Sequence, residues 1–96
     1  MRALAIFLET IHDMDGFEAY RSKVMPTIEA FGGRFLVRGG KWTTLEGAWS
    51  HERMAVLEFP SREAAEGWYN SPAYQAIVHD RLNNATCHAL IVDAAY

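Results

Sequence analysis

Two strand-like segments of this chain are apolar on both sides, and this feature constrains the fold more than any other. Residues 3–11, ALAIFLETI, carry apolar side chains at both odd and even positions, which point to opposite faces of a strand. Residues 54–59, MAVLEF, repeat the pattern with a single charged side chain, Glu58. Because a strand with one wet face alternates apolar with polar residues, these segments predict a sheet that is covered on both faces.

Apolar residues at helical spacing separate these strands and follow them. Residues 17–31 form one apolar stripe, which predicts a helix. Pro26 removes a backbone donor inside this stripe, so we expect a kink or a break about one turn earlier. A second helix is predicted to begin after Ser61 and to restart at Pro72, which follows a serine and suits the first helical position.

Two further β-rich runs, residues 34–38 and 87–92, complete the order of elements. We expect Gly39-Gly40 to bend the first of these strands, with residues 41–46 continuing it before the turn. The resulting order is β-α-β-β-α-β. It predicts an α+β, ferredoxin-like fold, in which a four-stranded antiparallel sheet carries two helices on one face.

Helices on one face leave the second apolar face of the predicted sheet without a cover. A large exposed apolar sheet is unusual in a monomer, so we expect a second copy of the chain to pack on it, sheet against sheet, in a two-fold homodimer. The length of 96 residues predicts a single domain over residues 1–96.

Composition and spacing exclude several classes of function. Nine Lys+Arg against twelve Asp+Glu give a net charge of −3, and no basic run indicates nucleic acid as a partner. No apolar run is long enough to predict a membrane span. The four histidines lack metal-ligand spacing, so we expect neither a metal nor another cofactor. The single cysteine, Cys87, is typical of a reduced thiol in a cytoplasmic protein.

Four blocks of sequence carry a resemblance to a known family. They are GGRFLVRGG at residues 32–40, LEG at residues 45–47 with Trp49, LEFPS at residues 57–61 and WYNSPAY at residues 68–74. In this order they resemble the bacterial domain-of-unknown-function family thirteen-thirty, within the dimeric α/β-barrel superfamily, over nearly the whole chain.

The resemblance implies a ferredoxin-like protomer whose sheet pairs with that of a partner to form a barrel. It implies no activity, because the family is uncharacterised. More distant relatives in the superfamily include cofactor-free monooxygenases, muconolactone isomerases and haem-degrading enzymes, most of which use a pocket between sheet and helices. A shared fold does not fix a function, so these activities are analogies.

Three residues are the predicted catalytic set. Glu58 lies on a central strand, and a carboxylate shielded from water is suited to acid–base catalysis near neutrality. Arg38, on the neighbouring strand, is its expected partner, either in a structural ion pair or as a planar group that binds a carboxylate or enolate ligand. His12, at the end of the first strand, is the candidate proton carrier.

Aromatic residues form the predicted ligand-binding set, although the same residues could instead form the core or the dimer interface. Trp49 is the hardest of them to assign to a core, because it lies in a predicted turn. Arg53 is included because its side chain could join Glu58 and Arg38, either in a structural ion pair or in a ligand site. The set is Tyr20, Phe35, Trp49, Arg53, Trp68 and Tyr69.

Two functions follow from these residues. The first is a homodimer with a small-molecule pocket between sheet and helices, acting as a cofactor-independent enzyme that transfers protons on, or oxygenates, an enolisable or aromatic organic acid. The second is a non-catalytic dimeric binding or interaction module, in which Glu58 and Arg38 are a structural pair. An open cavity of a few hundred Å³ favours the first function, and a filled interior favours the second.

Overall fold

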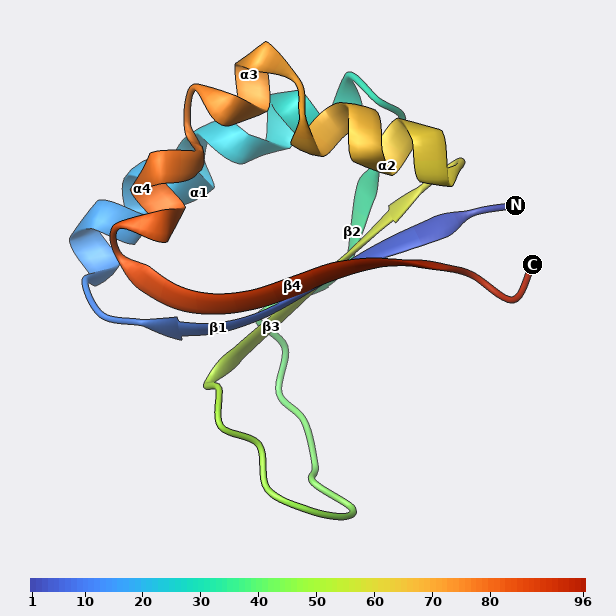
Figure 1. Ribbon diagram of the computed structural model, residues 1–96. Coiled ribbons are helices and arrows are strands. Elements are labelled where there is room, and N and C mark those ends of the chain that lie inside the picture. The colour runs from blue at the N-terminus through green and yellow to red at the C-terminus, as the bar shows by residue number, and fades with distance from the viewer.

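The computed structural model describes residues 1–96 and confirms the ferredoxin-like α+β fold (Figure 1). Its antiparallel sheet has the strand order β2-β3-β1-β4. All helices lie over one face of this sheet, which leaves the other face open (Figure 1). The strands are β1 (Ala3–Ile11), β2 (Arg34–Arg38), β3 (Arg53–Phe59) and β4 (Ala85–Asp93), and the helices are α1 (Met14–Glu29), α2 (Arg62–Tyr69), α3 (Pro72–Gln75) and α4 (Val78–Leu82).

The core lies between the sheet and the helices. On β1 and β3 every second side chain is buried against the helices, as alternation along a strand requires. Trp68 of α2 is fully buried at the centre, where its indole N–H donates to Thr27 Oγ1 at 3.0 Å and its ring lies 5.3 Å from that of Phe59. The buried apolar residues of the sheet are Ala3, Ala5, Phe7, Ala55, Leu57, Phe59 and Ala85.

The predicted kink or break before Pro26 does not interrupt the helix, because α1 runs continuously from Met14 to Glu29. Pro26 lies in the last turn, so its missing N–H removes only one bond near the end of the helix. Burial of Val24 and Ile28 against the sheet outweighs that loss. The second helical segment restarts at Pro72 as expected, but it divides further into α3 and α4.

A β-bulge in β2 decides which residues face the helices. Phe35 pairs with Leu57 and Val37 with Val56, so that Leu36 is an extra residue in the strand. The predicted bend is present at Gly39, where the chain turns with φ +70°. The prediction that residues 41–46 continue the strand was wrong, because β2 ends at Arg38. After the bulge, Arg38 pairs with Ala55 and points to the helix side.

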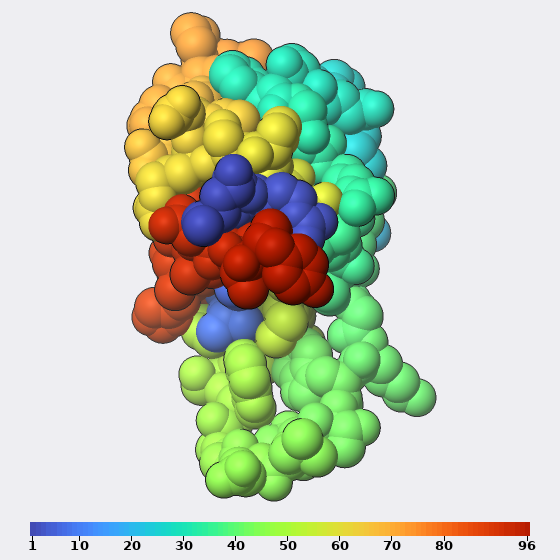
Figure 2. Space-filling model, turned by 90° about the vertical axis from the view of Figure 1, so that its right-hand side faces the viewer, coloured from blue at the N-terminus to red at the C-terminus, as the bar shows by residue number.

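The open face of the sheet is largely apolar, in agreement with the two-sided strands of the sequence. Residues 39–52 leave the sheet on this side as a long loop, away from the helices (Figures 1 and 2). No helix of the chain is both long and apolar enough to span a bilayer. The half-buried or exposed apolar residues of the open face are Leu4, Ile6, Leu8, Val37, Met54, Val56, Leu90 and Val92.

Candidate functional site

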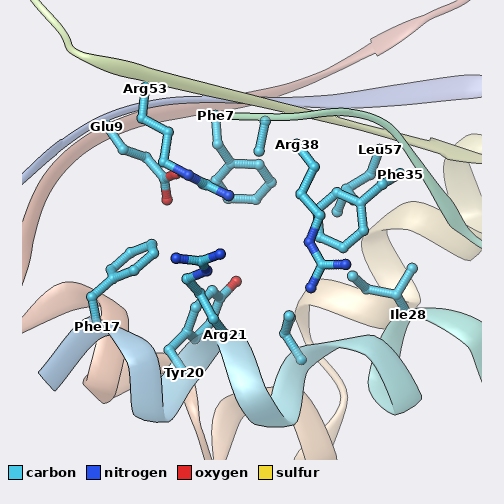
Figure 3. A pocket seen from close by; sticks show the side chains of 12 residues that line it. Phe7, Glu9, Phe17, Tyr20, Arg21, Ile28, Phe35, Arg38, Arg53 and Leu57 are labelled. Carbon is cyan, nitrogen blue, oxygen red and sulfur yellow. The ribbon is translucent and has the colours of Figure 1, made fainter. Parts of the chain in front are cut away.

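The strongest concentration of charge inside the fold lies between α1 and the covered face of the sheet (Figure 3). We call this site the arginine pocket. Its free volume is about 20 Å³, which is room for one water molecule. Four charged side chains, Glu9, Arg21, Arg38 and Arg53, are surrounded there by the rings and aliphatic groups of Phe7, Phe17, Tyr20, Val24, Ile28, Phe35, Ala55 and Leu57.

Glu9 and Arg53 form the buried ion pair of the arginine pocket. They are cross-strand partners on β1 and β3, and Glu9 continues the buried row that begins at Ala3. The Glu9 side chain is only 2% exposed, and its Oε1 accepts a hydrogen bond from Arg53 Nη1. The Arg53 guanidinium lies 5.6 Å from the centroid of the Phe17 ring. A carboxylate this deeply buried requires such a partner.

Arg38 and Arg21 bring two further positive charges that Glu9 does not balance. The Arg38 guanidinium stacks over Phe35 at 4.6 Å and makes neither an ion pair nor a hydrogen bond to another side chain. Arg21 contacts Glu18 outside the pocket at 3.2 Å, whereas its Nε is buried and has no hydrogen-bond partner. Arg21 points from α1 toward the sheet, and Arg38 points from the sheet toward α1 (Figure 3). The pocket is therefore electropositive and suited to an anion.

A buried hydrogen-bonded network supports the inner wall of the pocket. The hydroxyl groups of Tyr20 and Tyr74 lie 2.9 Å apart, and Arg81 Nε donates to the Tyr74 hydroxyl at 3.3 Å. Burial raises the pKa of both Tyr20 and Tyr74, so both phenols stay protonated at neutral pH. Arg81 is itself buried, 5.1 Å from the Phe7 ring. The network fixes the Tyr20 ring at the pocket and keeps its hydroxyl neutral.

A larger hollow lies beside the edge strand β4, between this strand and α2. It has a volume of about 450 Å³ and is open to solvent. Trp68, Tyr69, Leu90 and Ile91 contribute to its apolar lining. Its charged residue, Arg62, already bonds Asp93 at 3.0 Å. This hollow has room for a ligand but offers no free charged group to orient one.

The structure brings four of the predicted site residues together and separates the others. Tyr20, Phe35, Arg38 and Arg53 all line the arginine pocket. Trp68 and Tyr69 are instead part of the core and of the hollow beside β4.

His12 and Trp49 lie outside the arginine pocket. His12 is exposed at the end of β1, where its Nε2 shares a hydrogen bond with Thr86 Oγ1. Trp49 belongs to the long loop and packs against Trp42 with 6.0 Å between ring centroids. Neither side chain reaches the pocket, so neither can act on a ligand bound there.

The expected pairing of Glu58 with Arg38 was wrong. Glu58 lies on the open face, where Oε2 accepts from Arg2 Nη1 and Oε1 from Arg34 Nε at 3.0 Å. The bulge at Leu36 explains the error, because it shifts Arg38 to the opposite face of the sheet. Glu58 therefore joins β2, β3 and the N-terminal segment, away from the arginine pocket.

Sequence reasoning missed Glu9 and Arg21. The signal for Glu9 was present, because it stands two positions after Phe7 in the row of β1 that faces the helices. A charged residue in such a row is either paired or functional. Arg21 carried no signal, because it follows Tyr20 on a helix and only the packing of α1 shows that its Nε is shielded.

We expect Glu58→Gln to lower the free energy of unfolding by about 1 kcal/mol, because both arginine partners are exposed and solvent weakens such pairs. Urea denaturation at fixed protein concentration measures this change. Ligand affinity in the arginine pocket should stay the same, since Glu58 lies on the other face of the sheet. A fall in ligand affinity would contradict the assignment of Glu58 to a structural role.

The fold and the pocket together define an α+β protein of the ferredoxin-like kind, with a charged pocket under its first helix. Within this class, the chain belongs to the family described as "Domain of unknown function (DUF1330)", whose sequence profile matches residues 2–95. The resemblance found in the four sequence blocks is thereby confirmed. No curated protein is significantly similar to the sequence.

Solved structures agree with this fold. A protein of unknown function from Rhodopseudomonas palustris matches with a TM-score of 0.79 and 17% identity, over 99% of this chain and 83% of that one. A dimeric ferredoxin-like protein of unknown function from Jannaschia sp. CCS1 matches with a TM-score of 0.73 and 9% identity, over 98% of this chain and 100% of that one. SnoaB, a cofactor-independent oxygenase from Streptomyces nogalater, matches with a TM-score of 0.66 and 13% identity, over 99% of this chain and 94% of that one. At these identities the similarity shows the fold alone.

Proposed function

We propose that this protein is a homodimer whose arginine pocket binds, in each protomer, a small organic acid with an aromatic or enolisable body. One observation carries the proposal: three guanidinium groups and a single carboxylate line one pocket among aromatic side chains. Glu9 neutralises Arg53, which leaves Arg38 and the unpartnered Nε of Arg21 for an anionic ligand, while Arg21 Nη1 contacts Glu18 outside the pocket. A planar guanidinium binds a carboxylate through two parallel hydrogen bonds, and the ring walls suit a flat apolar body.

The pocket must open to admit such a ligand, because its free volume is about 20 Å³. The side chains of Arg21 and Arg38 extend into the pocket from opposite walls (Figure 3). Arg38 is exposed and Arg21 is half-buried, so rotation of these long side chains toward solvent creates space without a change in the backbone. A ligand carboxylate then replaces the lost contacts by bonding both guanidinium groups.

Proton transfer is the reaction that this set of groups supports. The Glu9 carboxylate accepts a proton from the carbon beside the ligand's carbonyl group, and Arg38 stabilises the enolate oxygen that forms. Return of the proton to a neighbouring atom completes an isomerisation without a cofactor. Oxygenation of the same enolate would require molecular oxygen as a second substrate, and the similarity in fold to SnoaB supports this variant only by analogy.

The homodimer is supported by the open face of the sheet. Leu90 and Val92 are exposed there beside the half-buried residues of β1 and β3. An apolar face of this kind is typical of an interface between subunits. Two of the similar solved structures are described as dimeric. We further place the protein in the cytoplasm, since its only cysteine, Cys87, is an unpaired and half-buried thiol.

Thermal denaturation with a panel of small aromatic and enolisable acids tests the proposal, with the matching uncharged amides as controls. At ten times its Kd, an acid that binds only the folded state stabilises it by about 1.4 kcal/mol. This corresponds to a rise in Tm of roughly 5–10 °C for a chain of this size. If no acid raises the Tm, or if the amides raise it equally, the proposed ligand class is wrong.

The non-catalytic dimeric module remains the second candidate, and the small free volume of the arginine pocket favours it. In this case the arginines of the pocket only stabilise the packing of α1 on the sheet and bind no metabolite. The same panel separates the two functions, because the module predicts no difference between acids and amides.

A further inference from the structure

The loop between β2 and β3 has an unusual form for its length. We call residues 39–52 the arm. Its backbone is bonded to the sheet only at its two ends, by Gly39 N to Met54 O at 2.8 Å and by Glu52 N to Glu9 O at 3.1 Å. Residues 40–51 make no backbone hydrogen bond at all. Loops this long without secondary structure are uncommon in compact domains and usually have a function.

The direction of the arm is fixed at its base by His51. This side chain is buried on the open face, where its Nδ1 lies 3.1 Å from Thr10 Oγ1 and its Nε2 lies 2.7 Å from His88 Nδ1. Thr10 belongs to β1 and His88 to β4, so His51 joins the arm to two strands. The arm consequently extends away from the sheet on the side opposite the helices (Figures 1 and 2).

The arm carries apolar groups that its own protomer leaves uncovered. Trp42 and Trp49 pack against each other with 6.0 Å between centroids, and Trp49 is nevertheless 46% exposed. Leu45, close to the tip, is 90% exposed. Loops normally lack large apolar side chains, and tryptophans are enriched where proteins bind one another. These residues therefore indicate an interaction surface.

We propose that the arm of each protomer packs against a second copy of this chain and holds the dimer together. This inference rests on the dimer proposed above. Two packed sheets lie about 10 Å apart, so a second sheet on the open face lies directly beside an arm that extends from that face. Two-fold symmetry then gives each protomer one arm and one surface that receives the partner's arm. The arm and the apolar open face thus form one continuous interface.

Sedimentation velocity over a dilution series tests this role with the double variant Trp42→Ser/Trp49→Ser. We expect the Kd of the dimer to rise at least about tenfold, because buried tryptophans are common hot spots of interfaces. Leu82→Ser is the matched control, since Leu82 is also half exposed but lies on α4, on the helix side of the sheet. It should leave the Kd unchanged.

Two further outcomes separate failure of the arm from failure of the dimer. A wild-type dimer that the double variant leaves intact, but that Leu90→Asp on the open face dissociates, overturns the arm inference alone. A wild-type protein that stays monomeric at tens of micromolar overturns the proposed dimer and the arm inference with it.

Acrylamide quenching gives an independent measurement, because Trp68 is fully buried and the accessible tryptophans are those of the arm. We expect quenching to decrease as the protein concentration rises through the Kd of the dimer. Quenching that does not depend on concentration would show that the arm is not covered by a second copy, and would overturn the inference.

Discussion

Glu9→Ala is expected to lower the free energy of unfolding by about 3–5 kcal/mol, because it leaves the other member of a buried ion pair without its partner. Glu9 is buried, and it is the only carboxylate among the four charged side chains of the arginine pocket. Without it, the Arg53 side chain, which is only 16% exposed, has no counter-ion. Urea denaturation at one fixed protein concentration measures the loss, because a dimer makes stability depend on concentration.

The double variant Glu9→Leu/Arg53→Met is the control for this prediction. Replacing both members of a buried ion pair by apolar groups of similar size is often neutral, so most of the lost stability should return. Glu58→Gln provides the comparison on the open face, where both partners are exposed and about 1 kcal/mol is expected. If Glu9→Ala costs no more than Glu58→Gln, the Glu9–Arg53 pair is not the buried electrostatic centre of the pocket.

The architecture could be predicted from the sequence because its signals are repeated over several elements. The strand segments around Ala5 and Val56 are apolar on both faces, and no arrangement with a single covered face explains them. The order of strands and helices then leaves few topologies. The break of the last helical segment between α3 and α4 was missed, because Ile77 lies in an uninterrupted apolar stripe with no glycine or proline.

The candidate site could be predicted only in part, because the orientation of one short strand decides it. In a regular strand, Arg38 would point away from Phe35 and toward the face of Glu58. The extra residue Leu36 reverses that orientation and places Arg38 over the Phe35 ring on the helix side. A bulge of one residue leaves no signal in a strand of only five residues, so the register had to come from the structure.

Glu9 has two effects on a ligand in the arginine pocket, and these effects oppose each other. Its charge neutralises Arg53 and so lowers the attraction for an anion, while the same carboxylate supplies the base of the proposed reaction. Glu9→Gln should consequently preserve or raise the affinity for an acid and abolish turnover. Arg38 has neither of these effects, since it stacks on the Phe35 ring and forms no ion pair within the protein. Its removal therefore tests binding without disturbing an ion pair.

Arg38→Met is expected to weaken the binding of an organic acid by about 10- to 100-fold, as measured by calorimetry with the acid that gives the largest Tm rise in the panel. A hydrogen bond to a charged group contributes roughly 1.5–3 kcal/mol, and each 1.4 kcal/mol is a factor of ten. Methionine keeps the apolar contact with the Phe35 ring, so the fold should be unaffected. The affinity for the matching amide should change little, because that ligand has no carboxylate.

Arg34→Met is the matched control for Arg38→Met, because both arginines lie on β2 and both variants remove one positive charge. Arg34 is 69% exposed on the open face, where it bonds Glu58, so its loss should change the affinity for the acid less than about twofold. If the two variants weaken binding equally, the acid responds to the overall charge of the protein. Only a large difference in affinity between the two variants shows that the carboxylate of the acid binds Arg38, which the bulge at Leu36 turns toward α1.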